Sequence, residues 1–266
     1  MRSSLRFVAP ALLLVLVLAA APVGASPVPV CFEGAATPGH LGTSGDDVIE
    51  GTAGDDVIIG LGGNDTLSGL GGRDRICGGE GNDLIDGGAD GDRLSGGEGD
   101  DTVFGRGGSD GLMLGGGGND VLNPGTGAEG HVGTVEGGDG NDRIVLNKWN
   151  DLDIFGGPGR DTLDFRRAPW AVYVDLRYDN FMSPGDPIPI IGYWVYDVEN
   201  VYGSPYSDFI HGDNHRNRLL GFGGNDQIYG HANDDYLDGG EGDADALYGG
   251  IGVDACVGGE TTVCEG

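Results

Sequence analysis

The chain has 266 residues, including 57 glycines and 12 prolines, and a formal net charge of −29. Nucleic acids and anionic membrane surfaces are poor partners for such a chain, because they carry the same sign of charge. This much glycine and proline is typical of a disordered linker unless the sequence is periodic, so periodicity decides the fold class.

Residues 1–25 have the pattern of a secretory signal peptide. Arg2 and Arg6 precede an apolar run from Ala9 to Ala21, and small residues follow as far as Ala25. The apolar run is too short to span a membrane, so we expect no membrane span and cleavage after Ala25. A retained N-terminal anchor is the alternative. The sequence therefore predicts a secreted, extracellular protein.

A nine-residue unit, Gly-Gly-x-Gly-x-Asp-x-Leu-x, repeats over residues 42–123 and returns over residues 203–257. Two isolated copies occupy residues 137–145 and 156–164. A fixed period of this kind indicates units that are stable only when they stack on one another. We expect two blocks of stacked repeats, at 42–123 and 203–257, on either side of a junction at 124–202.

Each position of the unit has a physical role. Its glycines permit positive φ, so the first six residues can form a tight turn. The last three form a short strand whose central aliphatic residue faces inward. Two repeats then make one coil of a flattened roll, which predicts an all-β fold, a parallel β-roll solenoid. The expected inward residues are Ile49, Ile58, Leu67, Ile76, Ile85, Leu94, Val103, Leu112 and Leu122, then Ile210, Leu219, Ile228, Leu237, Leu247 and Cys256. One extra residue, assigned to Leu114, shifts the register in the first block.

The aspartate at the sixth position recurs on both edges of the predicted roll. Asp47, Asp65, Asp83 and Asp101 should line one edge, and alternate repeats should place the others on the opposite edge. Stacked carboxylates repel one another unless a cation lies between them. One aliphatic side chain per nine residues is too little to order the chain alone.

Calcium is the cation that fits, because it accepts six or more oxygen ligands, and a glycine turn offers backbone carbonyls beside the aspartates. The predicted calcium ligands are Asp47, Asp56, Asp65, Asp74, Asp83, Asp92, Asp101, Asp110, Asp120, Asp142, Asp161, Asp208, Asp226, Asp235, Asp245 and Asp254.

These repeats resemble the RTX (hemolysin-type) calcium-binding nonapeptide family. The resemblance implies calcium ions between consecutive turns, about one per gap between stacked turns, held by the sixth-position aspartates and glycine-turn carbonyls. It also implies a chain that folds only when calcium arrives. The expected function is therefore that of a secreted, non-catalytic calcium-binding protein.

Four cysteines in an exported protein indicate two disulfides. Three pairings are possible, and we favour Cys31–Cys77 and Cys256–Cys264; free buried thiols are the alternative. The first would fasten residues 26–41, an N-terminal cap, onto the roll. The second would fasten residues 258–266, a C-terminal cap. Solenoids need such caps because their end coils present unpaired strand edges.

Aromatic residues are concentrated between Trp149 and Phe209, in the predicted junction and the first residues of the second block. Residues 172–176 alternate like a strand, so these aromatics are expected to pack the junction between the two blocks. The alternative is a binding face for extracellular polysaccharide or a cell surface, as in an adhesin. Exposure of Trp149, Trp170 and Trp194 on one face would favour that alternative.

No catalytic motif stands out from the repeats. The chain contains no His-Glu-x-x-His, the zinc-peptidase motif. Gly107–Gly111 matches the nucleophile-elbow pattern by letters, but Ser109 is simply the fifth position of a repeat. We therefore expect no enzymatic activity. A calcium-dependent hydrolase remains the less favoured alternative, and it would need a pocket within residues 124–202.

Overall fold

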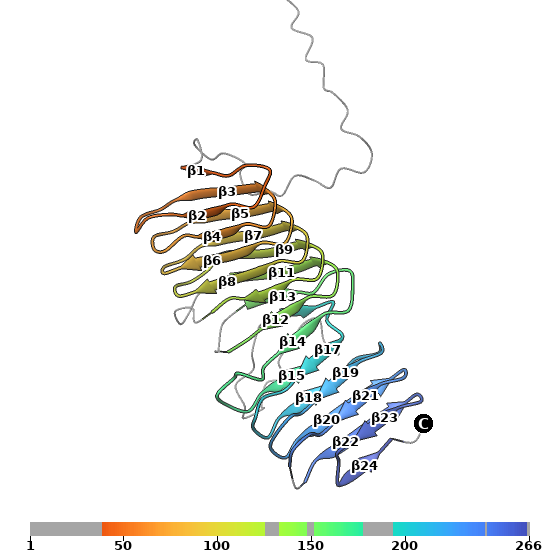
Figure 1. The fold of residues 1–266 in the computed structure, drawn as a ribbon. Helices are drawn as coiled ribbons and strands as arrows, with labels where there is room; N and C mark the ends of the chain where they lie inside the picture. The colour runs from red at the N-terminus through yellow and green to blue at the C-terminus, as the bar shows by residue number, and fades with distance from the viewer. Residues whose placement is uncertain (1–38, 126–132, 148–151, 178–193, 243, 265–266) are drawn as a thin grey trace, which may run out of the picture.

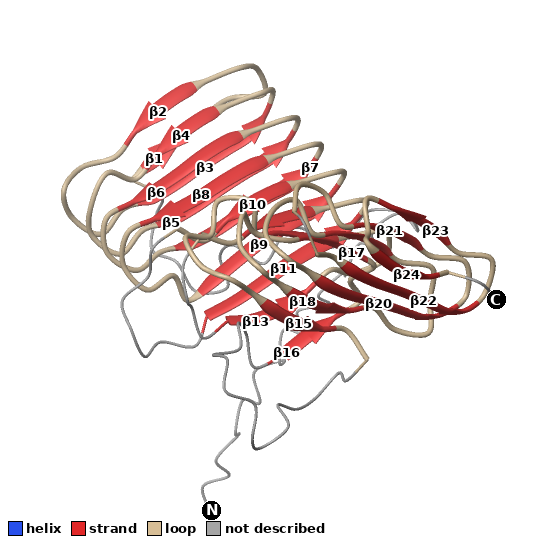
Figure 2. Ribbon diagram, turned by 90° about the horizontal axis from the view of Figure 1, so that it is seen from below, coloured by secondary structure: helices blue, strands red, loops and turns tan. Residues whose placement is uncertain are grey.

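The computed structural model describes residues 39–125, 133–147, 152–177, 194–242 and 244–264. Within these ranges the chain forms short parallel strands joined by turns, with no helix (Figures 1 and 2). Before and after the junction, successive strands alternate between two facing layers that wind into a flattened roll, as predicted. The predicted signal peptide and Cys31 lie outside the described residues.

Three sheets build the two layers (Figure 1). The N-terminal sheet contains β1 (His40–Leu41), β3 (Val57–Gly62), β5 (Arg75–Glu80), β7 (Arg93–Glu98), β9 (Leu112–Gly117), β11 (Gly133–Asp139), β13 (Leu152–Phe155) and β16 (Trp194–Tyr196). The continuous sheet contains β2 (Val48–Glu50), β4 (Thr66–Ser68), β6 (Leu84–Gly88), β8 (Thr102–Arg106), β10 (Val121–Asn123), β12 (Arg143–Val145), β14 (Thr162–Asp164), β17 (Asn200–Tyr202), β19 (Arg218–Leu220), β21 (Tyr236–Asp238) and β23 (Ala255–Val257). The C-terminal sheet contains β15 (Tyr173–Asp175), β18 (Phe209–His211), β20 (Gln227–Ala232), β22 (Ala246–Ile251) and β24 (Thr261–Val263).

The core is one layer of aliphatic side chains from each sheet, stacked in register. Ile58 pairs with Ile76, and Ile76 with Leu94, and all three are buried. The flanking strand residues face outward, because neighbouring side chains of a strand point to opposite faces. Ile49 and Cys256, in the terminal strands of the continuous sheet, are only partly buried. The eighth-position predictions are confirmed with one exception.

The exception is Leu112. Met113, opposite Leu94, is the buried residue, whereas Leu112 pairs with Arg93 and is half-buried. The extra residue is therefore Gly111, not Leu114. In the first block the N–H of the residue after the aspartate donates to the carbonyl of the aspartate one coil earlier. Gly111, which follows Asp110, makes this bond to the Asp92 carbonyl at 3.0 Å. An insertion at Gly111 instead of Leu114 places Leu112, Met113 and Leu114 on the opposite faces from those predicted, and the predicted register is regained afterwards.

The roll runs through the predicted junction on one side only. Ile144, Leu163, Val201 and Leu219 follow one another in the continuous sheet, so both isolated repeats form ordinary coils. On the other side the N-terminal sheet ends at β16 and the C-terminal sheet begins at β15. Across the junction the halves therefore share a single sheet.

Several junction side chains belong to the core. Phe165 and Val172 are buried, and Trp170 is partly buried and packs against the same cluster. Phe165 and Trp170 therefore pack in the core as expected, whereas Phe155, Tyr173, Tyr196 and Tyr202 are only half-buried and lie outside the core cluster. Trp149 and the side chain of Trp194 lie outside what the structure describes.

Cys256 and Cys264 lie side by side at the C-terminal end of the roll, with Cα atoms 6.1 Å apart. This separation is within the range of disulfides. Across the described ranges, nothing combines the length and apolar character of a membrane-crossing helix.

Candidate metal sites along the two edges of the roll

The sixth-position aspartates form two columns, one on each edge of the roll. The first-edge column contains Asp47, Asp65, Asp83, Asp101, Asp120, Asp142, Asp161, Asp235 and Asp254. The second-edge column contains Asp56, Asp74, Asp92, Asp110, Asp208, Asp226 and Asp245. The predicted division of alternate repeats between two edges is confirmed. The isolated copies extend the first-edge column with Asp142 and Asp161.

Each column is held by hydrogen bonds from the backbone of one aspartate to the side chain of the next. The Asp65 N–H donates to Oδ1 of Asp83 at 2.7 Å, and the Asp74 N–H donates to Oδ1 of Asp92 at 2.8 Å. This bond fixes one carboxylate oxygen per coil and leaves the other, Oδ2, without a fixed donor. Each carboxylate is thus locked in one orientation.

The second carboxylate oxygen is buried without a hydrogen-bond partner along most of both columns. This holds for Oδ2 of Asp65, Asp74, Asp83, Asp92, Asp101, Asp110, Asp120, Asp142, Asp161, Asp226, Asp235, Asp245 and Asp254. A buried carboxylate oxygen without a donor or a cation is costly, because burial removes its hydration. Because the same unpaired oxygen recurs in coil after coil, it indicates a position at which a cation can bind.

Glycine at the first position of the repeat opens the space around this oxygen. A Cβ atom added to Gly60 would collide with Oδ2 of Asp65 and with the carbonyl oxygen of Gly78, one coil further on. The same two kinds of oxygen crowd Gly69, from Asp74 and Gly87. Only glycine lets a carboxylate and a carbonyl of successive coils approach the same place.

These donors fit calcium. Carboxylate and carbonyl oxygens are the hard ligands that calcium prefers, and calcium tolerates their irregular geometry. Across the described ranges, no three His, Cys, Asp or Glu side chains converge closely enough to hold a metal. Backbone carbonyls would therefore have to complete each site.

Burial also shifts the titration of the columns. It raises the pKa of Asp92, Asp120 and Asp226 to about 7, and that of Asp101 to about 8. The backbone N–H on Oδ1 lowers each pKa in part, while neighbouring carboxylates raise it further. Without a cation, these groups would keep protons at pH values where an exposed aspartate is ionised.

Three predicted ligands differ from the rest, since side chains that the sequence analysis missed satisfy them. Oδ2 of Asp56 accepts the N–H of Thr52 at 2.6 Å and its hydroxyl at 2.9 Å. Thr43 binds Asp47 in the same way, and the Ser204 N–H and hydroxyl donate to Asp208. Asp47 and Asp56 begin the two columns, and Asp208 begins the second-edge column again after the junction. A Thr or Ser immediately after the first glycine of a repeat that begins a column is the signal that could have revealed these caps.

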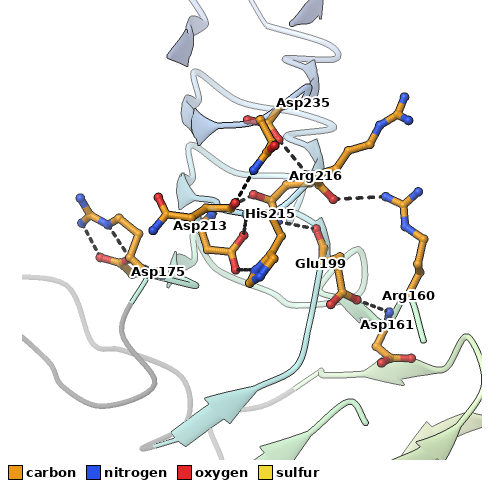
Figure 3. Close-up of polar contacts among 12 residues, drawn as sticks. Arg160, Asp161, Asp175, Glu199, Asp213, His215, Arg216 and Asp235 are labelled. Carbon is orange, nitrogen blue, oxygen red and sulfur yellow. Dashed lines mark hydrogen bonds and ion pairs between the residues drawn. The ribbon is translucent and has the colours of Figure 1, made fainter. Parts of the chain in front are cut away.

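A second missed residue is Glu199. Its Oε2 accepts the N–H of Asp161 at 2.8 Å, the role that an aspartate plays elsewhere (Figure 3). The signal was its spacing, because Glu199 precedes the buried Val201 by two residues, as Asp161 precedes Leu163. In the next coil the sixth position is the neutral Asn217.

A family model of the RTX calcium-binding nonapeptide repeat (4 copies) matches residues 41–76, 78–112, 113–128, 134–151, 197–227 and 211–244. The curated proteins provide no match to the chain. The matched residues make up more than half of the sequence and include the aspartates of both columns except Asp161, Asp245 and Asp254. The chain belongs to the RTX calcium-binding nonapeptide repeat family.

Proposed function

We propose that this protein is an extracellular, non-catalytic calcium-binding protein whose roll folds when calcium enters the gaps between stacked turns. The observation that carries the proposal is the row of buried, unpartnered Oδ2 atoms along both columns. One ion in each gap would supply the missing partner and cancel the repulsion between successive carboxylates. The strong negative charge of the chain is then mainly ligand charge.

The ligands would be the sixth-position aspartates together with turn carbonyls such as that of Gly78. Asp47, Asp56 and Asp208 would contribute less than the others, since Thr43, Thr52 and Ser204 already occupy their oxygens. Calcium sites of extracellular modules have dissociation constants of about 10⁻⁴–10⁻³ M. Folding would thus follow export through the predicted signal peptide into a calcium-rich medium.

Two disulfides would close the ends of the roll. Cys256–Cys264 is favoured by the short Cα separation. Cys31–Cys77 remains a proposal from the sequence, since Cys31 lies outside the described residues. Both would limit fraying of the end coils, where the stacking partner is missing on one side.

Circular dichroism and sedimentation of the mature, oxidised protein test the proposal. Metal-free protein should lack most of the β signal and sediment as an expanded chain. Calcium at 5 mM should restore a compact β protein, and magnesium at the same concentration should not, because magnesium demands stricter octahedral geometry. Full compactness in chelator, with the disulfides intact, would refute calcium-dependent folding.

A second candidate function, polysaccharide binding, is favoured by a groove of ≈ 420 Å³. Its lining combines the apolar Leu220 and Phe222 with Arg166, Asp238 and Glu241. Arg166 is held in place by a bidentate contact with Asp164, at 2.9 and 2.6 Å, and lies over the Phe222 ring. An apolar floor with fixed polar groups of both signs suits a neutral sugar unit.

Binding to immobilised neutral polysaccharides, with and without Phe222→Leu, tests this candidate. Leucine is the matched replacement, because Leu61 and Leu70 adopt the same positive φ at the equivalent position. Weaker retention of the variant, with an unchanged calcium-bound fold, would support sugar binding. Equal retention of both proteins, or of neither, would exclude this groove.

A further inference from the structure

The first-edge turn between β16 and β17 contains no nonapeptide and is three residues shorter than the turn before it, since Val195 and Val201 are six residues apart whereas their partners Ile154 and Leu163 are nine apart. Only Asp197, Val198 and Glu199 connect Tyr196 to Asn200. In the preceding first-edge turn, the six residues from Gly156 to Asp161 connect β13 to β14. A deletion of this size would be expected to end the column of carboxylates.

The column nevertheless continues through the short turn. Oε2 of Glu199 lies 2.8 Å from the N–H of Asp161, where Oδ1 of the next aspartate lies in an ordinary coil (Figure 3). The Asn200 N–H donates to the Asp161 carbonyl at 2.9 Å, as the Thr66 N–H donates to the Asp47 carbonyl at 2.8 Å. The longer glutamate side chain makes up for the missing backbone.

The oxygen atoms of a repeat site are also present. Oδ2 of Asp161 is buried and has no hydrogen-bond partner. The position of a Cβ on Gly156 is blocked by this oxygen and by the carbonyl oxygen of Asp197. Gly60 is blocked in the same way by Asp65 and the carbonyl of Gly78. The oxygens that face a calcium gap between two nonapeptides therefore recur where the second nonapeptide is missing.

On its far side the next column residue is the neutral Asn217 instead of a carboxylate, although the charges of Asp213 and Arg160 also act on Glu199. The Asn217 side-chain amide donates to the Glu199 carbonyl at 3.1 Å. The Arg160 side chain reaches past the short turn to the Arg216 carbonyl at 3.3 Å (Figure 3). These contacts hold the coils on both sides of the short turn together and need no ion between Glu199 and Asn217.

We propose that Asp161, Glu199 and the Asp197 carbonyl bind one calcium ion at the junction, between the nonapeptide that contains Asp161 and a turn that is not a nonapeptide, and that this ion couples the two halves of the roll. The proposal rests on the proposed calcium-binding function. Coupling follows from the topology, because among the described residues the continuous sheet is the sheet that both halves share, through the pairing of β14 with β17. Asp161 and Glu199 immediately precede these two strands, so an ion between them would reinforce that pairing.

Glu199→Gln tests the site, since glutamine can still accept the Asp161 N–H but carries no charge. Glu136→Gln, on the exposed face of β11, is the matched control. Native mass spectrometry in millimolar calcium should show one ion fewer per chain for Glu199→Gln than for the wild type and the control. Urea unfolding at saturating calcium should separate into two transitions for Glu199→Gln alone.

Wild-type ion content and a single unfolding transition in Glu199→Gln would overturn the proposal. A wild-type protein that binds no calcium would instead refute the proposed function itself, so the two failures are distinguishable. If Glu199→Gln does not fold, anomalous scattering from calcium-grown crystals of the wild type decides. A calcium peak between Asp161 and Glu199 supports the site, and its absence while the repeat gaps show peaks refutes it.

Discussion

The backbone N–H of Asp83 donates a 2.7 Å hydrogen bond to Oδ1 of Asp101, one full coil along the chain. The same hydrogen bond thus joins two successive coils and fixes the orientation of the carboxylate. Because this bond fixes the orientation of the Asp101 carboxylate, Oδ2 of Asp101 is left buried without a hydrogen-bond donor. Stacking therefore creates both the repulsion between carboxylates and the oxygen position at which a cation can relieve it.

Removal of one interior carboxylate charge should weaken calcium-dependent folding. Asp92→Asn is expected to raise the calcium concentration at the folding midpoint by several-fold, because the buried Oδ2 of Asp92 would lose its charge as a ligand. Calcium titration followed by circular dichroism measures the midpoint. Asp90→Asn is the control, since Asp90 is exposed and asparagine tolerates its φ of 72°. Equal midpoints for the two variants would contradict the ligand role of Asp92.

The metal-free protein should gain β structure as the pH falls. The raised folded-state pKa values, about 7 for Asp92 and Asp120 and about 8 for Asp101, mean that folding takes up protons. Their stabilising contribution is complete below the unfolded value of about 4 and is lost as the pH rises through 7 to 8. Circular dichroism of dialysed, metal-free protein should therefore show more β structure at pH 4.5 than at pH 8.

With calcium present, the pH dependence should have the opposite sign. Protons and calcium compete for the same carboxylates, so the calcium midpoint should rise between pH 8 and pH 6. Titration at fixed ionic strength in several buffers measures this shift. A midpoint independent of pH would show that the buried aspartates do not bind the ion.

The threonine cap at the start of the second-edge column should stabilise the first coils. Thr52→Val removes the hydroxyl that donates to Oδ2 of Asp56 at 2.9 Å, while the backbone donor remains. We expect a loss of about 0.5–1.5 kcal/mol in the free energy of unfolding at saturating calcium. Thr66→Val, at an exposed position of β4, is the control and should be neutral or slightly stabilising.

The register after Gly111 can be checked by two neighbouring substitutions. Met113→Ala should cost about 2–5 kcal/mol, because Met113 is buried between the sheets. Leu112→Ala should cost well under this, since Leu112 is half-buried on the outer face. Urea unfolding at saturating calcium gives both values, and the reverse order would restore the register predicted from the sequence.

Much of the candidate site could be predicted because the repeat is local. The nine-residue period identifies the turn, the strand and the inward aliphatic residue from residues close in sequence, such as Asp65 and Leu67. It also divides Asp65 and Asp74 between opposite edges, since two repeats make one coil. The insertion at Gly111 was not predicted because Leu112, Met113 and Leu114 are all apolar. Whichever residue is taken as the extra one, an apolar side chain occupies the inward position.

The sequence by itself determined the roll, the two columns of aspartates and the resemblance to a calcium-binding repeat family, because each depends on short-range periodicity and on the chemistry of the side chains. Only the tertiary structure decided that the first-edge column passes through the junction by way of Glu199. Asp161 and Glu199 are 38 residues apart, and no period predicts their contact. Their contact exists because β17 pairs with β14, which places the turn that precedes each strand beside the other.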